Sequence, residues 1–326
     1  MTKCNSFHSI IRKLRLPVVA APLFIISVPK LVIAQCKAGI IGSFPALNAR
    51  EAPGEEPLLE KWLREITDEL DRHNQKYPER PAAPFAVNQI VHKSNLRLQR
   101  DIDICARWSV PIWITSLGAK EEVNNAAHSC GGIVLHDVIN NTYAKKAIAK
   151  GADGLIAVAA GAGGHAGNLS PFALMNEIRS WFSGPLLLSG SISTGQALMA
   201  SLILGADLGY IGTPFIATKE ANADNKYKRM LISSTSEDIV NSSLFTGVPG
   251  NYLAPSITAA GLDVNNLPDS NPNSMDFEKL AKKTKAWKEI WGSGQGINPI
   301  KNILTTNELI SRIENEFVNC KNKLKQ

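Results

Sequence analysis

The sequence is poor in the residues that build metal and disulfide sites. Only five cysteines occur among 326 residues, an odd number, and no two of them have C-x-x-C spacing. The six histidines include neither an H-E-x-x-H nor an H-x-H motif. These gaps argue against a disulfide framework and a zinc site, and they favour reduced thiols. We therefore expect a cytoplasmic protein without a metal centre.

Long apolar runs are also missing. The stretch from Leu16 to Val28 follows three basic residues and imitates a signal peptide, but Pro17 and Pro22 interrupt it and no convincing cleavage site follows. No run reaches the ~18 apolar residues that a membrane helix needs. The sequence therefore predicts neither a signal peptide nor contact with a membrane.

Acidic residues are absent from the first 50 positions, which hold seven basic ones and account for the net charge of +6. Residues 111–217 are close to neutral, with five basic and six acidic side chains. Aromatic residues make up only 6% of the chain, and no nucleic-acid-binding motif is present. A charge excess confined to one end is not a binding stripe, so we expect no nucleic-acid partner.

What the sequence does contain is a regular alternation of short apolar runs with helix-length amphipathic segments. Such alternation is typical of βαβ units around a parallel sheet. The runs expected to be strands are 17–20, 39–42, 85–88, 111–115, 132–135, 155–158, 185–188 and 208–211. Eight strands with intervening helices predict an α/β protein with a (β/α)8 TIM barrel. A Gly-Ala-Asp junction that precedes both the sixth and the eighth run supports this repeat.

The amino-acid composition changes after residue 217, where Asn, Ser and Lys become frequent and strand-like apolar runs cease. Helices are expected over 220–232, 276–291 and 308–324. We therefore divide the chain into a barrel over 1–217, completed by 293–326, and a helical C-terminal appendage or lid over 218–292 that covers the barrel mouth. Within the barrel, helices are expected to start near Ser27, at Leu58 and near Ser94, and residues 44–57 are expected to form a loop.

Function in a barrel of this kind lies on the loops that leave the C-terminal ends of the strands. The loop after the sixth strand places His165 among four glycines between positions 161 and 167. Glycines permit positive φ and the close approach of a flat ligand, and imidazole suits proton transfer near neutral pH. His165 is therefore the candidate catalytic residue.

The loops after the seventh and eighth strands pair glycine with hydroxyl residues, in Ser189-Gly190-Ser191 and Gly212-Thr213. Backbone N–H groups and hydroxyls of this kind can bind a phosphate at the position where the fold commonly holds one. The same residues would also suit ordinary tight turns, and the pattern alone leaves both interpretations open. A second candidate pair, His136-Asp137, directly follows the fifth expected strand. Neighbouring side chains on a strand point to opposite faces, so both can line one pocket only if the loop has already begun there.

Taken together, these motifs resemble the nitronate monooxygenase family, which comprises FMN-dependent TIM-barrel flavoenzymes. The matching segments span nearly the whole chain in the family's order: Ala20–Leu23, Ala160–Gly167, Ser189–Ile192, Gly205–Asp207, Gly212–Phe215 and Ser293–Gly296. The resemblance implies oxidation of alkyl nitronates, or of nitroalkanes, with O2 to a carbonyl compound and nitrite. FMN, a small nitronate and O2 would be the only partners, with a homo-oligomer left open.

The resemblance also assigns roles to residues. His165 takes the place of the family's catalytic histidine. The residues implied to bind FMN are Ala21, Pro22, Leu23, Asn88, Gly163, Gly164, Ser189, Gly190, Ser191, Gly212, Thr213, Ser293 and Gln295. The chain departs from the family where members often have Met at Leu23, Gly at Ser191 and Arg at Pro214, and the last change removes a cation and an N–H donor near the phosphate.

Two other functions remain open from the sequence. One is an FMN- and NAD(P)H-dependent enoyl-ACP reductase, which shares the fold and the Gly-Gly-His loop. The other is a flavin-binding protein without this activity, an interpretation that rests on Ser191 and Pro214.

Overall fold

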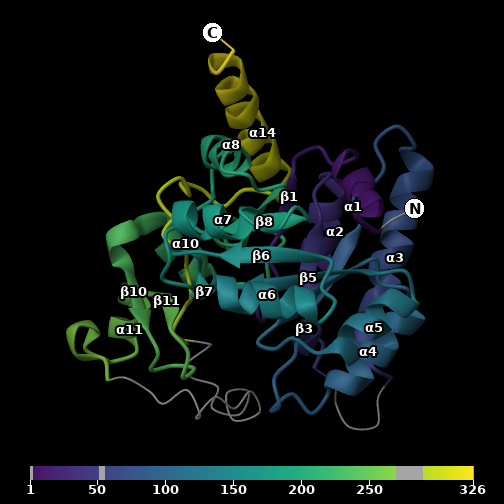
Figure 1. Ribbon diagram of the computed structural model, residues 1–326. Coiled ribbons are helices and arrows are strands. Elements are labelled where there is room, and N and C mark those ends of the chain that lie inside the picture. The colour runs from purple at the N-terminus through teal and green to yellow at the C-terminus, as the bar shows by residue number, and fades with distance from the viewer. Residues whose placement is uncertain (1–2, 51–55, 269–288, 326) are drawn as a thin grey trace.

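The computed structural model describes residues 3–50, 56–268 and 289–325 of the chain. Within these ranges one sheet of eight parallel strands curls into a barrel surrounded by helices (Figure 1). The barrel strands are β1 (Val18–Ala20), β2 (Gly42–Pro45), β3 (Phe85–Ile90), β4 (Ile112–Ser116), β5 (Ile133–Val138), β6 (Gly154–Val158), β8 (Leu186–Ser189) and β9 (Leu208–Ile211). Their spatial order, β1-β9-β8-β6-β5-β4-β3-β2, confirms the predicted (β/α)8 barrel.

The barrel closes around β1. On one side β1 pairs in parallel with β9, with Val18 opposite Gly209. On the other side Val19 forms a parallel bridge to Ile41, and the Ala20 N–H donates to the Ile41 carbonyl at 2.8 Å. The first strand therefore joins both edges of the sheet, which leaves the barrel with no open edge at this point.

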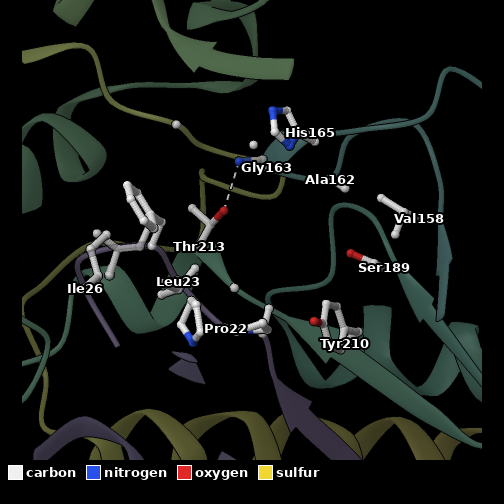
Figure 2. Close-up of a pocket in the computed structure, with 18 of the residues that line it drawn as sticks. Pro22, Leu23, Ile26, Val158, Ala162, Gly163, His165, Ser189, Tyr210 and Thr213 are labelled. Carbon is white, nitrogen blue, oxygen red and sulfur yellow. Dashed lines mark hydrogen bonds between the residues drawn. The ribbon is translucent and has the colours of Figure 1, made fainter. Parts of the chain in front are cut away.

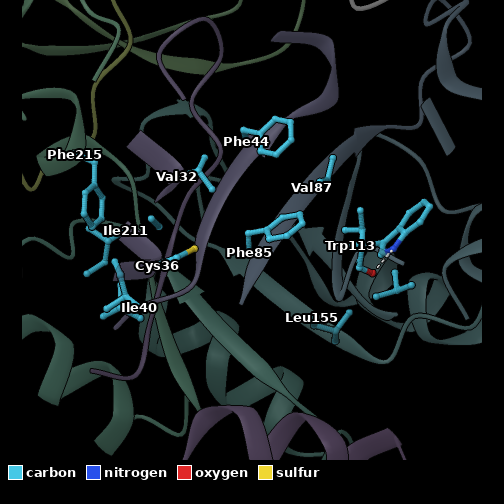
Figure 3. Close-up of a cluster of buried hydrophobic side chains, with 14 of the residues drawn as sticks. Val32, Cys36, Ile40, Phe44, Phe85, Val87, Trp113, Leu155, Ile211 and Phe215 are labelled. Carbon is cyan, nitrogen blue, oxygen red and sulfur yellow. Dashed lines mark hydrogen bonds between the residues drawn. The ribbon is translucent and has the colours of Figure 1, made fainter. Parts of the chain in front are cut away.

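Helices around the barrel pack apolar side chains against the outside of the strands, and Figure 3 shows part of this cluster, with Val32, Phe85 and Trp113. In α3 (Leu58–Lys76) the buried residues Leu59, Leu63, Ile66 and Leu70 follow the helical period. The other helices are α1 (Lys3–Ile11), α2 (Pro29–Lys37), α4 (Leu98–Arg107), α5 (Glu121–Ser129), α6 (Asn141–Ala149), α7 (Pro171–Arg179), α8 (Gly195–Ile203), α9 (Thr213–Ile216), α10 (Asn225–Ser233), α11 (Ala254–Ala259) and α14 (Thr306–Lys323). None of the described helices is long and apolar enough to cross a membrane.

The inside of the barrel is filled by a separate apolar cluster from alternate strand positions, including Val19, Ile112, Ile156 and Leu187. Phe7 of α1 is fully buried in this cluster. The helix lies at the end of the barrel remote from β10 and β11 (Figure 1). The basic N-terminal segment thus supplies part of the core of the barrel.

Several boundaries differ from the sequence-based expectation, among them the ends of β3 and β5, which extend two and three residues further, to Ile90 and Val138. The second strand begins at Gly42, three residues late, because Gly39 adopts a φ of +86° and ends α2 with a turn. Ser27 does not cap α2; its hydroxyl instead accepts from the Leu23 N–H at 3.0 Å, and Val28 precedes the helix. Ser94 does not cap α4 either, because its side chain bonds His92, at 2.9 Å.

The repeated Gly-Ala-Asp junction has a structural counterpart. Asp153 accepts from the Val134 N–H at 2.8 Å, and Asp207 accepts from the Leu186 N–H at 2.8 Å. Each carboxylate thus ties the chain entering one strand to the start of its neighbour in the sheet, and each is paired with a cationic or histidine side chain. The repeated Gly-Ala-Asp sequence therefore corresponds to a repeated hydrogen bond between neighbouring strands of the barrel.

The appendage is not purely helical, so that expectation was wrong. Two short strands, β10 (Ile239–Ser242) and β11 (Gly250–Leu253), form an antiparallel hairpin that extends to β7 (Gly164–His165) in the loop after β6. These strands are four residues long and partly polar, so they lack the apolar run that identifies a strand. The helix expected over 220–232 begins only at Asn225, and the one over 276–291 falls mostly outside the described residues.

The last helix, α14, packs along α8 on the outside of the barrel (Figure 1). The two backbones approach so closely that a Cβ at Gly195 would lie 2.1 Å from the Phe317 nitrogen. The Glu316 carboxylate accepts from the Gly195 N–H at 2.8 Å and so caps α8. The C-terminal helix is therefore fixed to the outside of the barrel through α8.

Candidate functional site

A cavity of about 520 Å³ opens at the C-terminal ends of the barrel strands. This volume lies within the range of small-molecule and cofactor sites. Figure 2 shows its surroundings, with Pro22 and Leu23 near Thr213, Ser189 and Tyr210 deeper in the barrel, and His165 across the opening. The cavity therefore lies where the fold class is expected to carry its function.

One wall of the cavity is the segment that follows β1. Ile25 has a φ of +67°, an unfavourable backbone conformation for a β-branched residue. Asn48 holds the segment in this shape: its amide donates to the carbonyls of Leu23 and Ser27 at 3.0 and 2.8 Å and accepts from the Ile25 N–H at 2.8 Å. Asn48 lies in the region expected to be a loop, and no sequence motif indicates it.

The opposite wall carries His165. Residues 164 and 165 pair with Asn251 and Gly250 of β11, so the appendage holds the histidine as part of a small sheet. The Nε2 atom lies 3.0 Å from the Thr246 hydroxyl. Burial lowers the pKa of His165 to about 4, which keeps the imidazole neutral near pH 7.

Three glycine-rich loops meet behind this wall. The Gly161 carbonyl accepts from the N–H groups of Gln295 and Ser191, at 2.9 and 3.3 Å. The Gly294 N–H donates to the Thr213 hydroxyl at 2.9 Å (Figure 2). A Cβ at Gly163 would lie 2.7 Å from the Gly294 nitrogen, so only glycine permits this approach. The late segment 293–296 therefore closes onto the loops after β6, β8 and β9.

The structure brings nearly all candidate residues of the sequence analysis to one cavity. The lining includes His165, Ala21, Pro22, Leu23, Asn88, Gly163, Gly164, Ser189, Gly190, Ser191, Gly212 and Thr213. Ser293 and Gln295 lie just behind the lining, while Gly292, Gly294 and Gly296 face it. Ser191 takes the left-handed conformation that glycine prefers, with a φ of +56°.

The ends of the central strands add polar side chains to the site, of which the sequence analysis considered Asp137 alone, in its pair with His136. Asp137, Ser116 and Tyr210 all line the cavity, at the ends of β5, β4 and β9. The Asn88 amide donates to the Ser116 hydroxyl at 2.8 Å. Burial raises the pKa of Asp137 to about 6, although hydrogen bonds from Ser116 and the Leu117 backbone oppose the rise. The signal that could have identified them is position alone, since each stands where its strand ends.

The neighbouring pair His136 and Asp137 separates as the strand geometry predicts. Only Asp137 lines the cavity. His136 is 6% exposed and bonds the Thr115 hydroxyl at 2.6 Å through Nδ1. Burial lowers its pKa to about 4, so it is a neutral residue of the barrel interior.

The described lining of the cavity contains no lysine or arginine. Pro214 faces a different, smaller hollow next to Arg312. The Arg312 guanidinium donates to the Ser193 carbonyl at 3.0 Å and to the Pro299 carbonyl at 2.9 Å, so it braces the backbone behind the Ser191 loop. An anionic ligand in the cavity would therefore depend on backbone donors and hydroxyls, as the neutral charge of residues 111–217 predicts.

The outer side of the cavity is apolar and aromatic. Tyr227 and Trp291 stack with ring centroids 4.9 Å apart and planes inclined by 10°. Both line the cavity, together with Ile26 and Ile216. This side suits the carbon skeleton of a substrate or a flat ring.

Comparison with known proteins decides the family. The family profile described as nitronate monooxygenase matches residues 5–316. The chain belongs to the nitronate monooxygenase family. Membership of this family places it among the oxidoreductases.

The relatives of this family member are distant. It is 25% identical to the nitronate monooxygenase of Paraburkholderia phytofirmans, over 95% of this chain and 94% of that protein. It is 24% identical to a probable nitronate monooxygenase of Staphylococcus saprophyticus, over 86% and 88% of the two chains. A Rhodococcus jostii protein named as a hydroxy-methyl-oxo-octahydro-indene-carboxyl-CoA dehydrogenase is also 24% identical, over 85% and 71%.

Solved structures agree with the fold. FabK of Thermotoga maritima matches with a TM-score of 0.79 at 22% identity, over 98% of both chains. Nitroalkane oxidase of Streptomyces ansochromogenes matches with a TM-score of 0.74 at 21% identity, over 97% of this chain and 99% of the other. At these identities the likeness establishes the barrel with its appendage and leaves the reaction to the residues of the site.

Proposed function

We propose that this protein is a flavin-dependent nitronate monooxygenase that uses FMN and O2 to convert alkyl nitronates to carbonyl compounds and nitrite. The observation that carries the proposal is His165, held by β11 at the mouth of a barrel cavity in a member of the nitronate monooxygenase family. The names of the Paraburkholderia relative and of the Streptomyces structure support the same chemistry.

The residues present fit a flavin. Gly212 lies beside Ala21 and Leu23, where a Cβ would come within 3.3 Å of the Leu23 side chain, so glycine leaves a flat surface there without a tight contact. Gly164 faces open space, with a φ of +66°. Hydroxyl, amide and carboxyl groups of Asn88, Ser116 and Asp137 match the needs of a polyol chain and a ring edge. When bound, the flavin supplies the electron transfer and the reaction with O2.

Different residues of the chain would then bind different parts of the flavin. The loops after β8 and β9, with Gly190, Ser191, Gly212 and Thr213, would hold the phosphate through N–H groups and hydroxyls. Ala21, Pro22, Leu23 and Asn88, with the backbone of Gly163 and Gly164, would contact the ring. Ser293 and Gln295 would keep the late segment closed over the Gly161 loop, with the Gln295 N–H already bonded to the Gly161 carbonyl at 2.9 Å.

His165 would act on the substrate. A neutral imidazole can bond the nitro group, or it can take the proton from the carbon next to that group if a neutral nitroalkane binds. Its low pKa follows from burial, so a bound anion beside it would favour the protonated form again. The aromatic side of the cavity would shield this proton transfer from water.

The test begins with the absorption spectrum of the purified protein. We expect a flavin spectrum, bleaching by an alkyl nitronate without oxygen, and O2 consumption with nitrite release in air. The His165→Asn variant should keep its flavin and lose at least ~100-fold in kcat/KM, the usual range for a lost acid or base. His73→Asn, on the surface helix α3, serves as the control and should match the wild type.

Two outcomes would overturn the proposal. Protein that is colourless and does not take up added FMN would indicate a member without this activity. Rapid bleaching by NADH or NADPH, with indifference to nitronates, would favour the enoyl-ACP reductase, the alternative left open by the sequence.

A further inference from the structure

The Thr246 side chain is the hydrogen-bond partner of the candidate catalytic histidine. It lies in the turn between β10 and β11, 81 positions from His165, and is 3% exposed. Its hydroxyl oxygen lies 3.0 Å from the His165 Nε2 atom, 2.9 Å from the Val248 carbonyl oxygen and 3.3 Å from the Val248 nitrogen. The Tyr252 side chain lies next to Thr246. No sequence motif indicates Thr246.

A threonine hydroxyl has a single proton to donate but can accept from several donors. The Val248 carbonyl is purely an acceptor, and at 2.9 Å two oxygens repel unless a proton lies between them. The Thr246 proton therefore points to the Val248 carbonyl. The Val248 N–H is a donor, and at 3.3 Å it points to the Thr246 hydroxyl oxygen. The imidazole must then donate as well, which places the proton on Nε2.

We propose that Thr246 is a positioning residue that holds His165 in the neutral tautomer protonated at Nε2, so that Nδ1 offers its lone pair to the substrate. Within the described part of the chain, no side chain or backbone group hydrogen-bonds Nδ1. The inference rests on the proposed function, and it specifies which form of the substrate the site accepts.

An imidazole in this tautomer accepts a proton from the substrate and has no N–H left for a nitro oxygen. It is therefore suited to a neutral nitroalkane. The bond between the α-carbon and its hydrogen breaks, the proton moves to Nδ1, and the electron pair shifts into the nitro group to give the nitronate. The imidazolium and the nitronate then stabilise each other inside the cavity. A preformed nitronate skips this step and depends less on the tautomer.

Few other titratable groups lie near His165 in the described cavity. The other titratable side chains lining the described cavity are Asp137 on β5, Tyr210 on β9, and Asp224 and Tyr227 at α10. Tyr252 on β11 also contacts Thr246, and burial raises its pKa to about 12, so it stays neutral. Asp137 is therefore the group whose titration must be separated from that of His165 in a pH profile.

The test compares Thr246→Val, which keeps the shape and loses the hydroxyl, with Thr246→Ser, which keeps the hydroxyl. Thr258→Val, on the exposed side of α11, controls for the substitution itself. The flavin-loaded proteins are labelled with 15N-histidine, and long-range 1H–15N correlations report which imidazole nitrogen is protonated. His165→Asn identifies the signals of His165 among those of the six histidines.

We expect an Nε2-protonated His165 in the wild type and in Thr246→Ser, and a tautomer mixture in Thr246→Val. With a neutral nitroalkane, kcat/KM of Thr246→Val should fall ~10- to 100-fold, with an altered pH profile, as when a partner orienting a histidine is lost. With a preformed nitronate it should fall less than ~3-fold. Thr246→Ser should retain wild-type rates, and melting temperatures check that each variant is folded.

A wild-type His165 protonated at Nδ1, or an unchanged tautomer in Thr246→Val, would overturn the proposal. Equal losses in Thr246→Ser and Thr246→Val, or equal losses on both substrate forms, would reduce Thr246 to a structural residue and overturn it too. Wild-type protein that oxidises neither substrate form would instead contradict the proposed function. The tautomer measurement would then still test whether Thr246 orients His165.

Discussion

Asp137 offers a quantitative test of the electrostatics of the cavity. Burial raises the pKa of its carboxyl from 3.8 to about 6, and the hydrogen bonds from Ser116 and Leu117 oppose the rise only in part. The folded chain therefore binds a proton at Asp137 more tightly than the unfolded chain does. The bound proton therefore adds to the free energy of unfolding. This contribution is fully present below pH 3.8 and is lost as the pH rises through about 6.

The magnitude follows from the size of the shift. About two pKa units at ~1.4 kcal/mol per unit amount to ~3 kcal/mol over the whole titration. Of this, ~1.4 kcal/mol falls between pH 5 and pH 8. Asp137 remains partly exposed to the cavity, and solvent there weakens the effect. We therefore expect the free energy of unfolding to change by about 1 kcal/mol between pH 5 and pH 8.

The assay is urea unfolding of the flavin-free wild type and Asp137→Asn at pH 5 and pH 8. The free energy of unfolding of the variant should improve relative to the wild type by about 1 kcal/mol between the two pH values. The substitution also removes hydrogen bonds of the carboxyl group. Their loss lowers the free energy of unfolding by the same amount at both pH values, so it cancels in the comparison. His136 and His165, whose pKa values are lowered to about 4, titrate in both proteins and cancel as well. A difference that does not change with pH, or that changes in the opposite direction, would refute a buried, poorly compensated carboxyl at Asp137.

Two further predictions concern the C-terminal segment. Gly195→Ala should lower the free energy of unfolding by about 2–3 kcal/mol, because the new Cβ would lie 2.1 Å from the Phe317 nitrogen. The exposed neighbour Gln196→Ala is the control in the same urea titration, and equal stabilities of the two variants would contradict the close approach of α8 and α14. Thr213→Val removes the acceptor of the Gly294 N–H and should destabilise the closed segment by about 1–2 kcal/mol. It should also weaken retention of the proposed cofactor, FMN, measured by fluorescence titration. Thr213→Ser should restore retention, and an unchanged FMN affinity in Thr213→Val would argue against the role of this bond.

The barrel could be predicted from the sequence because each of its strands is buried on both faces. Leu186–Ser189 and Leu155–Val158 are runs of apolar residues between turn signals, and such runs identify parallel strands without any tertiary information. The hairpin of β10 and β11 could not be predicted in this way. Gly250–Leu253 contains a glycine and an asparagine, and its strand conformation depends on pairing with Gly164 and His165 far away in the chain.

The candidate site shows the same division. Residues on glycine-rich loops, such as His165 and Gly212, could be identified because glycine marks a turn at the end of a strand. Ser116 and Tyr210 could not, because a polar residue at the end of an apolar run has no pattern of its own, and Asp137 was a candidate only through its pair with His136. Thr246 reaches the site through tertiary contact alone, which local sequence does not encode.

The order of the elements along the chain bears on how the protein folds. Residues 293–296 and α14 follow all eight barrel strands in the sequence, yet they bond Gly161, cap α8 and brace the loop after β8. During synthesis the eight strands can therefore pair before the segment that closes the glycine-rich loops has been made. Closure of these loops is thus a late event in folding, and a chain interrupted after β9 would hold the strands without the contacts that order its loops.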